Sequence, residues 1–404
     1  MRYAEIAVDA PAGHSRTFSY SIPDDLTLVP GQIVRVPFGS QRLQGVVMSL
    51  EPEPKVPQTR DVAALVEETP VLDATRLELA KWVSHYYMST LFEAAAPMLP
   101  PGLRSRPKVT VTLNADVAAG IEDTLSESQQ KLVAYLRKNG AVDQSRLARA
   151  LGDWAMRAAQ SLAKRGVVTL TGVHHRPAIA AKYVRYVTLA IPPDEARLHL
   201  DSFGRAVRQK ALLEHLSGSK PPLLVAEARK EYGAPALKAL LERGWIVERE
   251  QREYRDPLAG KEYERSGPVE LTPAQKDAVT QIVTALENPD IQPKMFLLQG
   301  VTGSGKTEVY LEAIARCLAQ GKRVIFLVPE IALTHQTIER LEGRFPGEVA
   351  VQHSGLKPGE RFDQWWEIKD GAYGIVVGSR GAIFAPQSDL GLIVVDEEHE
   401  WTYK

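Results

Sequence analysis

The chain has 404 residues, enough for about two to four folded domains, so a single small binding module is excluded. Hydrophobic residues make up 44% of the sequence and charged residues 25%, which excludes wholesale disorder and fibrous repeats. The formal net charge is −1, which excludes a uniformly basic nucleic-acid coat protein but is compatible with a local basic surface.

The N-terminal stretch opens with short β-prone runs that prolines and glycines separate. These runs are residues 4–8, 17–22, 32–37 and 43–50. A helix is predicted from residue 74 to about residue 89, because leucine and aromatic side chains recur there at helical spacing. A proline- and glycine-rich stretch at 97–102 ends this pattern, so residues 1–105 are predicted to form a β-rich domain, a barrel or a sandwich.

The middle of the chain contains an internal repeat of three short helices followed by a glycine turn and a β-prone pair. Gln130 and Gln209, at the starts of the first helices, are 79 residues apart, and the turn glycines Gly166 and Gly244 are 78 apart. The other predicted helices are 145–151 and 155–164 in the first copy, and 224–230 and 234–242 in the second. This order predicts tandem winged helices of α+β class, which often place one helix on DNA, although a protein-interaction or spacer module fits it equally. The predicted bounds are residues 106–181 and 182–250.

The first copy carries a local surplus of positive charge. Between Ser126 and Arg185 there are eleven lysines and arginines and three acidic residues. A surplus of this size in a chain of net charge −1 favours phosphate binding, since nucleic-acid phosphates attract clustered cations. A solvated face without a ligand is the alternative.

The last third of the chain has a different pattern. Residues 251–267 are charged and aperiodic, which predicts a linker. Residues 268–404 then alternate β-prone runs with helices such as 306–320, which predicts an α/β domain whose parallel sheet has helices on both faces. The β-prone runs are 295–298, 323–328, 349–352, 374–378 and 391–395. Trp365 and Trp366 are predicted to pack a helix against this sheet rather than to stack on a base.

A phosphate-binding loop lies between the first of these runs and the helix that follows it. Its eight residues match the P-loop pattern, in which glycines let backbone N–H groups surround phosphate oxygens and the helix N-terminus adds its positive dipole. Lys306 is predicted to reach the β- and γ-phosphates of ATP, and Thr307 to hold Mg²⁺ through its hydroxyl. The predicted nucleotide-binding residues of the loop are Gly300, Val301, Thr302, Gly303, Ser304, Gly305, Lys306 and Thr307.

Acidic residues after the last β-prone run complete the predicted catalytic set. Asp396 is predicted to hold Mg²⁺, and Glu397 to orient or deprotonate the attacking water, while a solvent-facing acidic strand end is the structural alternative. Upstream, Gln275 carries an amide donor and a carbonyl acceptor that suit the edge of adenine. Thr272 and Pro273 before it also fit the start of a helix, and the two interpretations are compatible.

Six motifs in this order resemble superfamily 2 DNA helicases, and in detail the primosomal protein N′ (PriA) family of replication-restart helicases. They are Leu-Thr-Pro-x-Gln (271–275), Gly-Val-Thr-Gly-Ser-Gly-Lys-Thr-Glu-Val-Tyr (300–310), Val-Pro-Glu-Ile-x-Leu-Thr (328–334), His-Ser-Gly (353–355), Gly-Ser-Arg-x-Ala-Ile-Phe (378–384) and Asp-Glu-Glu-His (396–399). Residues 16–20, 35–39 and 86–87 resemble that family's 3′-DNA-binding domain.

The resemblance implies an ATP-dependent 3′-to-5′ helicase that recognises stalled replication forks and initiates primosome assembly, with a RecA-like lobe over residues 268–404. The implied partners are branched and single-stranded DNA, the 3′ end at a fork, helicase-loader proteins and single-stranded DNA-binding protein. By position, Arg380 matches a motif that touches DNA, and Trp401 starts an aromatic-rich loop that couples DNA to hydrolysis, with core packing as the alternative.

The resemblance also implies a pocket for the terminal 3′ nucleotide in the first domain. Phe18 and Gly39 match that pocket. Ser19 stands where the family has an acidic residue, which implies a weaker or differently supplied contact to the 3′-hydroxyl.

Other parts that the family pattern implies lie beyond Lys404: a second helicase lobe with its arginine finger, and a cysteine-rich zinc insertion. We therefore expect an N-terminal half that binds ATP at most weakly and does not unwind DNA alone, with zinc only in the C-terminal part and no zinc site in this chain. Cys317, the single cysteine, allows no internal disulfide and is expected to be a small core residue. No apolar stretch reaches the roughly 18 residues of a membrane span, so a cytoplasmic protein without a membrane partner is expected.

Two other functions fit parts of the sequence. A non-catalytic module that reads forks and 3′ ends would need no ATP turnover. A P-loop kinase or transporter ATPase would share the phosphate loop, but it would not account for residues 396–399 or for the DNA-binding pattern upstream.

Overall fold

The computed structural model describes residues 2–11, 13, 15–39, 41–103, 108–114, 116, 124–173, 179, 181–218, 222–288, 290–292, 294–329 and 335–403. The chain divides into a larger unit, made of Met1–Ile179 and Glu262–Lys404, and a smaller unit, Ala180–Lys261. No helix among the described residues is long and apolar enough to cross a membrane.

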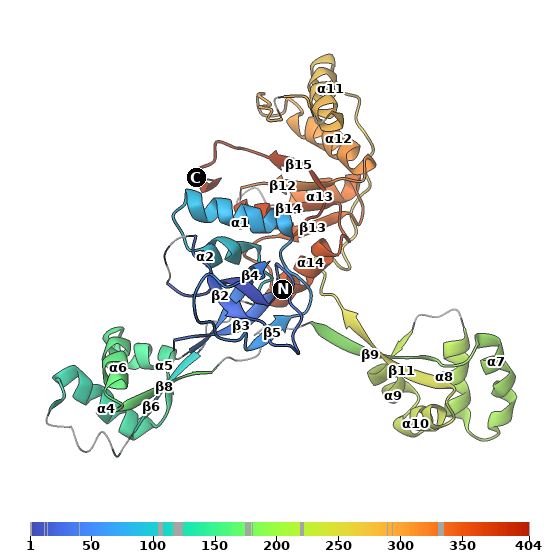
Figure 1. The fold of residues 1–404 in the computed structure, drawn as a ribbon. Coiled ribbons are helices and arrows are strands. Elements are labelled where there is room, and N and C mark those ends of the chain that lie inside the picture. The colour runs from blue at the N-terminus through green and yellow to red at the C-terminus, as the bar shows by residue number, and fades with distance from the viewer. Residues whose placement is uncertain are drawn as a thin grey trace. The chain divides into compact units, whose positions relative to one another are not determined.

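The N-terminal part of the larger unit is an antiparallel sheet of five strands in the order β2-β1-β4-β3-β5 (Figure 1). The strands are β1 (Tyr3–Val8), β2 (Phe18–Ser21), β3 (Ile33–Phe38), β4 (Gln41–Glu51) and β5 (Ala64–Glu67). Ile6, Val34 and Val47 belong to its buried core. The sequence pattern predicts the first four strands and misses β5, whose four residues are all only partly buried.

Short helices follow this sheet: α1 (Ala74–Tyr86), α2 (Leu91–Ala95) and the 3₁₀ turn η1 (Ala96–Met98). Asp73 starts α1 by accepting a hydrogen bond from the backbone N–H of Arg76. The helix ends three residues before the predicted residue 89, because Met88 adopts a φ of 54°, a left-handed conformation that a continuing helix excludes.

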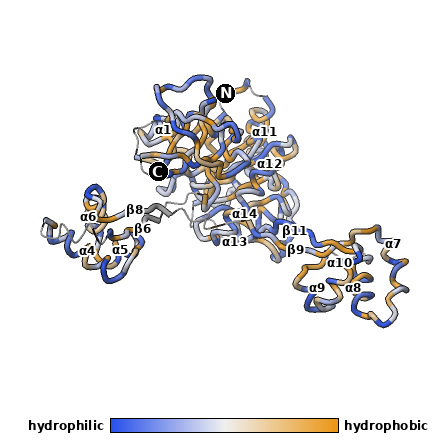
Figure 2. The backbone as a smooth tube through the Cα atoms, turned by 60° about the horizontal axis from the view of Figure 1, so that its bottom comes forward, coloured by the Kyte–Doolittle hydropathy of each residue, from blue (hydrophilic) through white to orange (hydrophobic). Residues whose placement is uncertain are grey.

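The internal repeat predicted from the sequence is present as a repeated order of elements. The larger unit holds one copy: β6 (Lys108–Leu113), α4 (Glu127–Asn139), β7 (Val142–Asp143), α5 (Gln144–Leu151), α6 (Trp154–Lys164) and β8 (Val168–Val173). The smaller unit holds the other: β9 (Lys182–Leu189), α7 (Pro193–Leu198), η3 (His199–Phe203), α8 (Val207–Ser217), β10 (Leu223–Leu224), α9 (Val225–Glu231), α10 (Ala234–Glu242) and β11 (Ile246–Glu253). The sheet orders are equivalent, β7-β6-β8 and β10-β9-β11. Hydrophobic stretches, orange in Figure 2, occur in both copies, and each copy buries its own core.

The structure corrects the assignment of positive charge to the first copy. Lys182 and Arg185, counted with that copy, lie on β9 of the smaller unit. There they form ion pairs with Glu253 and Glu248 of β11, because the two strands pair along their whole length. The end of β11 also lies three residues inside the predicted linker.

The C-terminal part of the larger unit is a parallel sheet in the order β13-β14-β12-β15. Its strands are β12 (Arg323–Leu327), β13 (Val349–Gln352), β14 (Ile375–Gly378) and β15 (Leu390–Val395). Its helices are α11 (Pro273–Glu287), α12 (Lys306–Ala319), α13 (His335–Arg344) and α14 (Pro358–Lys369), with the 3₁₀ turns η4 (Arg380–Phe384) and η5 (Trp401–Tyr403). Trp365 and Trp366 are buried on α14, which packs against β13, so their predicted packing role is confirmed.

The predicted strand over residues 295–298 is wrong, since no ladder forms there. Met295 and Leu297 are 85% and 78% exposed, and apolar residues of the edge strand β15, such as Ile393, are exposed as well. An apolar run has a tendency to be buried, but it becomes a strand only when a neighbouring strand pairs with it.

Candidate nucleotide-binding site and DNA-binding residues

The phosphate loop is shaped by its glycines and closes on its own lysine. Gly305 precedes α12 with a φ of 80°, a left-handed conformation that glycine adopts without penalty. The helix then begins at Lys306, whose ammonium donates to the carbonyl oxygen of Gly300 at 2.7 Å and lies 3.4 Å from that of Val301. The lysine is therefore held over the loop in which phosphate oxygens would lie.

Gln275 reaches the same loop from the start of α11. Thr272 and Gln275 form a capping box, which confirms the predicted N-cap with Pro273 in the first turn. The amide nitrogen of Gln275 donates to the carbonyl oxygen of Ser304 at 2.9 Å. A Cβ atom on Gly305 would lie 2.3 Å from this nitrogen, so the glycine is required for the contact.

A cavity of about 670 Å³, called here the P-loop cavity, brings the predicted catalytic residues together. Lys306 and Thr307 line one part of it, and Asp396 and Glu397 line another. The remaining lining residues are Ser266, Gly267, Val269, Val301, Thr302, Gly303, Gly305, Glu308, Leu311, Arg340 and Arg344. Residues separated by about ninety positions in the sequence therefore face one hollow.

Asp396 directly follows β15, and its electrostatic surroundings are unusual. Burial and the neighbouring Glu397 carboxylate raise the pKa of Asp396, although the Glu397 backbone N–H, Lys306 and Tyr310 act in the opposite sense. The same burial, together with the Asp396 carboxylate, raises the pKa of Tyr310 to about 12. Two adjacent acidic groups, the partly buried Asp396 and the exposed Glu397, favour a bound cation.

Glu397 holds a strained backbone. Its φ is 50°, a left-handed conformation that costs a residue with a side chain about 1–2 kcal/mol. Its N–H donates to the Asp396 carboxylate at 3.1 Å, and His399 lies 3.6 Å from its side chain. Strain of this kind persists where the surrounding structure imposes it, often at functional sites.

Sequence reasoning missed the arginines of the P-loop cavity. Arg340 and Arg344 are one helical turn apart on α13, so both point from one face of the helix. Arg344 also pairs with Glu312 of α12 at 3.5 Å. Their spacing could have indicated a shared face, but nothing in the sequence relates that face to the P-loop.

The residues of the P-loop cavity fit Mg²⁺ bound with a nucleotide. The Thr307 hydroxyl and the Asp396 carboxylate supply the oxygen donors that this ion prefers, and both face the cavity. Across the described part of the chain, no group of three or more histidine, cysteine, aspartate or glutamate side chains could hold a metal ion without other ligands. Buried Cys317, whose pKa burial raises to about 11, packs as a core residue.

The N-terminal sheet brings the predicted 3′-end residues close together. The ring of Phe18 meets that of Phe38, the neighbour of Gly39, edge to face at 5.1 Å. Arg60, which the sequence did not single out, donates to the carbonyl oxygen of Gly39 at 3.0 Å. An aromatic ring and a cation therefore flank this backbone turn.

Ser19 lies in this region but is already engaged. It sits directly opposite Glu5 in the β1–β2 ladder, and its hydroxyl donates to the Glu5 carboxylate. Thr17 and Lys55 also donate to that carboxylate, which is 1% exposed. Burial raises the pKa of Glu5, but hydrogen bonds from Ser19, Thr17 and Lys55 outweigh this effect and hold it below its ordinary value.

Arg380 and Trp401 are brought near one another at the end of the parallel sheet. The Arg380 guanidinium lies 3.3 Å from the carbonyl oxygen of Thr402, and Trp401 is 77% exposed. Tyr403 donates to the backbone oxygen of Asp396 at 3.2 Å, so this segment also touches the acidic site. The motif at 328–334 has residues 330–334 outside the described part of the chain.

Comparisons with known protein families agree with this division of the chain. Residues 5–100 match the family described as the 3′ DNA-binding domain (3'BD). Residues 268–404 match the family described as type III restriction enzyme, res subunit. The two matches cover the antiparallel sheet with its helices and the parallel sheet with the P-loop.

Curated relatives align along the whole chain. The replication restart protein PriA of Bacillus subtilis (strain 168) is 34% identical over 418 residues, which cover 100% of this chain and 50% of that protein. The protein of the same name from Synechocystis sp. is 34% identical over 422 residues, covering 100% of this chain and 48% of the relative. The chain thus spans about half the length of these relatives.

Proposed function

Because the chain belongs to the PriA family of replication restart proteins, we propose that it forms the nucleotide- and DNA-binding part of an ATP-dependent 3′-to-5′ helicase that restarts replication at stalled forks. The observation that carries the proposal is the P-loop cavity, which joins Lys306 and Thr307 to Asp396 and Glu397. The lobe over residues 268–404 is then a RecA-like lobe of superfamily 2.

Each residue of the P-loop cavity has a separate part in this proposal. Lys306 neutralises the β- and γ-phosphates, and the backbone of 300–305 surrounds them. Glu397 accepts a proton from the attacking water, and Gln275 contacts the adenine edge from α11. A Mg²⁺ ion held by Thr307 and Asp396 would neutralise charge on the phosphate oxygens.

The DNA contacts come from several domains. Residues 1–105 read the 3′ end through Phe18, Ser19 and Gly39, and Arg380 and Trp401 contact the strand on the lobe. Residues 106–181 and 182–250 act as winged helices joined to the lobe by 251–267. Their repeated strand and helix order supports this assignment.

The chain spans about half the length of the curated relatives, and we propose that it supplies nucleotide and DNA binding but does not unwind DNA by itself. The protein works in the cytoplasm with helicase-loader proteins and single-stranded DNA-binding protein.

Nucleotide binding by the 404-residue chain tests the proposal. A fluorescent ATP analogue should bind the parent chain, and Lys306→Ala should weaken binding at least tenfold, because a charge-assisted contact to phosphate is lost. Lys276→Ala removes an equal charge from exposed α11, outside the P-loop cavity, and should leave affinity unchanged. Equal affinities of the parent and Lys306→Ala would refute the P-loop assignment.

A second test addresses the non-catalytic alternative, a module that reads forks and 3′ ends without ATP turnover. Forks that end in a 3′-hydroxyl should bind more tightly than forks that end in a 3′-phosphate, because the phosphate adds bulk and charge at the pocket of Phe18 and Gly39. Equal affinities would contradict 3′-end reading. End preference without nucleotide binding would favour a module that only reads DNA.

A further inference from the structure

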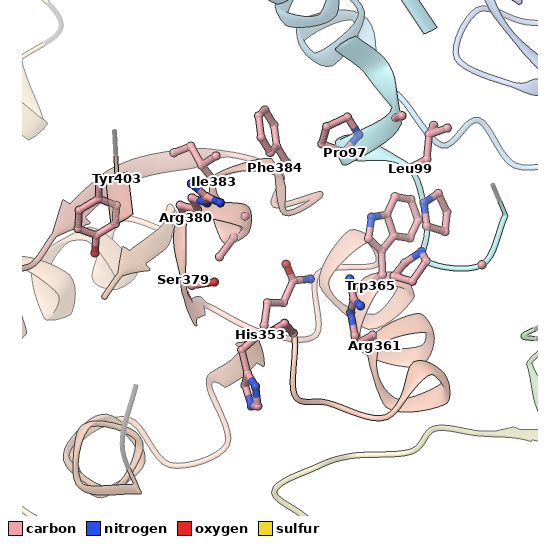
Figure 3. A pocket seen from close by; sticks show the side chains of 18 of the residues that line it. Pro97, Leu99, His353, Arg361, Trp365, Ser379, Arg380, Ile383, Phe384 and Tyr403 are labelled. Carbon is pink, nitrogen blue, oxygen red and sulfur yellow. The ribbon is translucent and has the colours of Figure 1, made fainter. Parts of the chain in front are cut away.

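A cavity of about 750 Å³ lies in the larger unit and shares no lining residue with the P-loop cavity. One wall is formed by residues 96–102 and Tyr87, and the others by α14, by η4 and by the end of β13 (Figure 3). The walls are tied together where Arg76 of α1 donates to the carbonyl oxygens of Ala385 and Gln387 at 2.9 and 2.8 Å. We call this hollow the tryptophan–arginine cavity.

The tryptophan–arginine cavity is positively charged. Arg361 and Arg380 line it, and no aspartate or glutamate does so among its described lining residues. Within the described ranges, Arg361 is exposed and forms no ion pair, and the Arg380 guanidinium donates to the backbone oxygen of Thr402. Two guanidinium groups without carboxylate partners favour an anion, and their planar N–H pairs fit phosphate.

Trp365 adds a buried hydrogen-bond donor to the lining of this cavity. Its side chain is 3% exposed and meets Trp366 edge to face at 5.0 Å, which fixes the ring. Its Nε1 atom is buried and has no hydrogen-bond partner among the described residues. In Figure 3 this nitrogen is on the side of the ring that faces Phe384 and Arg380. This N–H group is therefore free to donate to an acceptor on a ligand in the cavity.

Part of the remaining lining of the tryptophan–arginine cavity is apolar, and Gln352, His353, Ser354 and Ser379 add polar groups to it. Leu99, Ile383 and Phe384 line it with three prolines of the 96–102 stretch. Such walls suit the flat face of a base, whereas the ring nitrogens and carbonyl oxygens of bases accept hydrogen bonds. The volume lies in the range of about 300–1,000 Å³ found for ligand pockets.

We infer that the tryptophan–arginine cavity binds one nucleotide unit, its phosphate held by Arg361 and its base beside Trp365, which donates its N–H, while Arg380 adds positive charge elsewhere in the cavity. This inference rests on the proposed DNA-binding function, which makes a single strand the source of the nucleotide, although a free nucleotide has the same chemistry. A peptide would match the charge of Arg361 and Arg380 only if it were acidic, so an acidic peptide is one outcome of the test.

Anisotropy of a labelled oligo(dT) tests the inference with the 404-residue chain. Arg361→Gln should weaken binding about fivefold to tenfold, and the slope of log affinity against log salt should become shallower by about 0.7, the value for one phosphate contact on a single strand. Lys357→Gln removes one charge next to α14, outside the cavity, and should match the parent. Unchanged affinity and slope in Arg361→Gln would overturn the inference.

Trp365 is tested by Trp365→Phe, which keeps an aromatic ring and removes the N–H. We expect a twofold to fivefold loss of oligo(dT) affinity with an unchanged melting temperature. Should this variant fail to fold, photocrosslinking of the parent chain with a 5-iodouracil oligonucleotide replaces it. Crosslinks to Tyr87, Phe384 or residues 96–102 support the inference, and crosslinks found only elsewhere overturn it.

Further measurements distinguish a free nucleotide from a DNA strand as the ligand. They also test this inference independently of the proposed function. Binding of dTMP that depends on Arg361 would assign the cavity to free nucleotide, whereas Arg361-dependent binding of oligo(dT) alone assigns it to a DNA strand. An acidic peptide that requires Arg361, with oligo(dT) affinity unchanged in Arg361→Gln, would overturn the inference in favour of a protein partner. Arg361→Gln should bind the fluorescent ATP analogue like the parent, so failure of the P-loop assignment is scored independently in Lys306→Ala.

Discussion

The P-loop cavity and the tryptophan–arginine cavity are of similar size, about 670 and 750 Å³, yet they are built differently. The P-loop cavity takes many of its lining residues from one short loop and adds two acidic residues at a strand end. The tryptophan–arginine cavity takes its residues from distant segments and lacks acidic residues among its described lining, although arginines line both cavities. The first is suited to a cation with a phosphate chain, and the second to an anion with an apolar ring.

The comparison shows how the two cavities depend on the fold. Backbone conformation at a few adjacent residues shapes the P-loop cavity, since Gly305 and the start of α12 place the N–H groups. Side-chain packing shapes the tryptophan–arginine cavity, since α14 must lie against the sheet for Trp365 to face the hollow. Substitutions that disturb packing should therefore affect the tryptophan–arginine cavity. Substitutions that disturb the local backbone should affect the P-loop cavity.

The largest expected effect comes from Trp366→Ala. Trp366 is buried against Phe362 and Trp365, and truncation of a buried tryptophan costs about 3–5 kcal/mol of folding free energy. Urea titration should show this loss, and the folded fraction should bind oligo(dT) more weakly while it still binds the ATP analogue. Trp401→Ala removes an exposed ring and should change stability by less than about 0.5 kcal/mol. Equal losses of affinity for oligo(dT) and for the ATP analogue in Trp366→Ala would contradict the different dependence of the two cavities on packing.

An intermediate effect is expected from Gly305→Ala. The left-handed conformation costs alanine about 1–2 kcal/mol, and its Cβ would collide with Gln275, so ATP-analogue affinity should fall about 5–30-fold. Oligo(dT) affinity should be unchanged. Gly321→Ala has a similar φ of 71° but meets no atom within 4 Å, so it serves as the control for the backbone cost alone. A similar loss of nucleotide affinity in both variants would show that local loop shape is not the cause.

The smallest effect is expected at Glu5, a charged group whose partners lie within the protein rather than on a ligand. Glu5 has three donors, and its folded-state pKa is below the ordinary value of 4.5, so its stabilising contribution is present above about pH 4.5 and lost as pH falls further. In Glu5→Gln, the free energy of unfolding, measured by circular dichroism, should fall less steeply as the pH decreases below about 4.5. Binding of the ATP analogue should not change. Glu53→Gln, on the exposed stretch after β4, should keep the parent profile. A parent-like acid limb in Glu5→Gln would contradict the assignment.

Features determined by neighbouring residues were predictable from the sequence alone. The helix Ala234–Glu242 matches its predicted bounds, and the N-cap Thr272 and Pro273 lie where the pattern indicated them. The P-loop belongs to the same class, because glycine at 305 permits a backbone conformation that other residues resist. In each case the interactions that decide the structure involve residues a few positions apart, so they can be predicted from the spacing of residues in the sequence.

Features that need a partner from elsewhere in the chain were decided only by the tertiary structure. Residues 295–298 have the composition of a strand and do not form one, since a ladder requires a second strand. Ser19 is predicted to contact the 3′ end, and only the fold reveals that its hydroxyl lies opposite Glu5 and donates to that buried carboxylate. Arg361 and Trp365 carry no motif, and only the packing of α14 aims them into a shared cavity. Burial and electrostatic pairing depend on which distant groups meet, and residue spacing does not specify that.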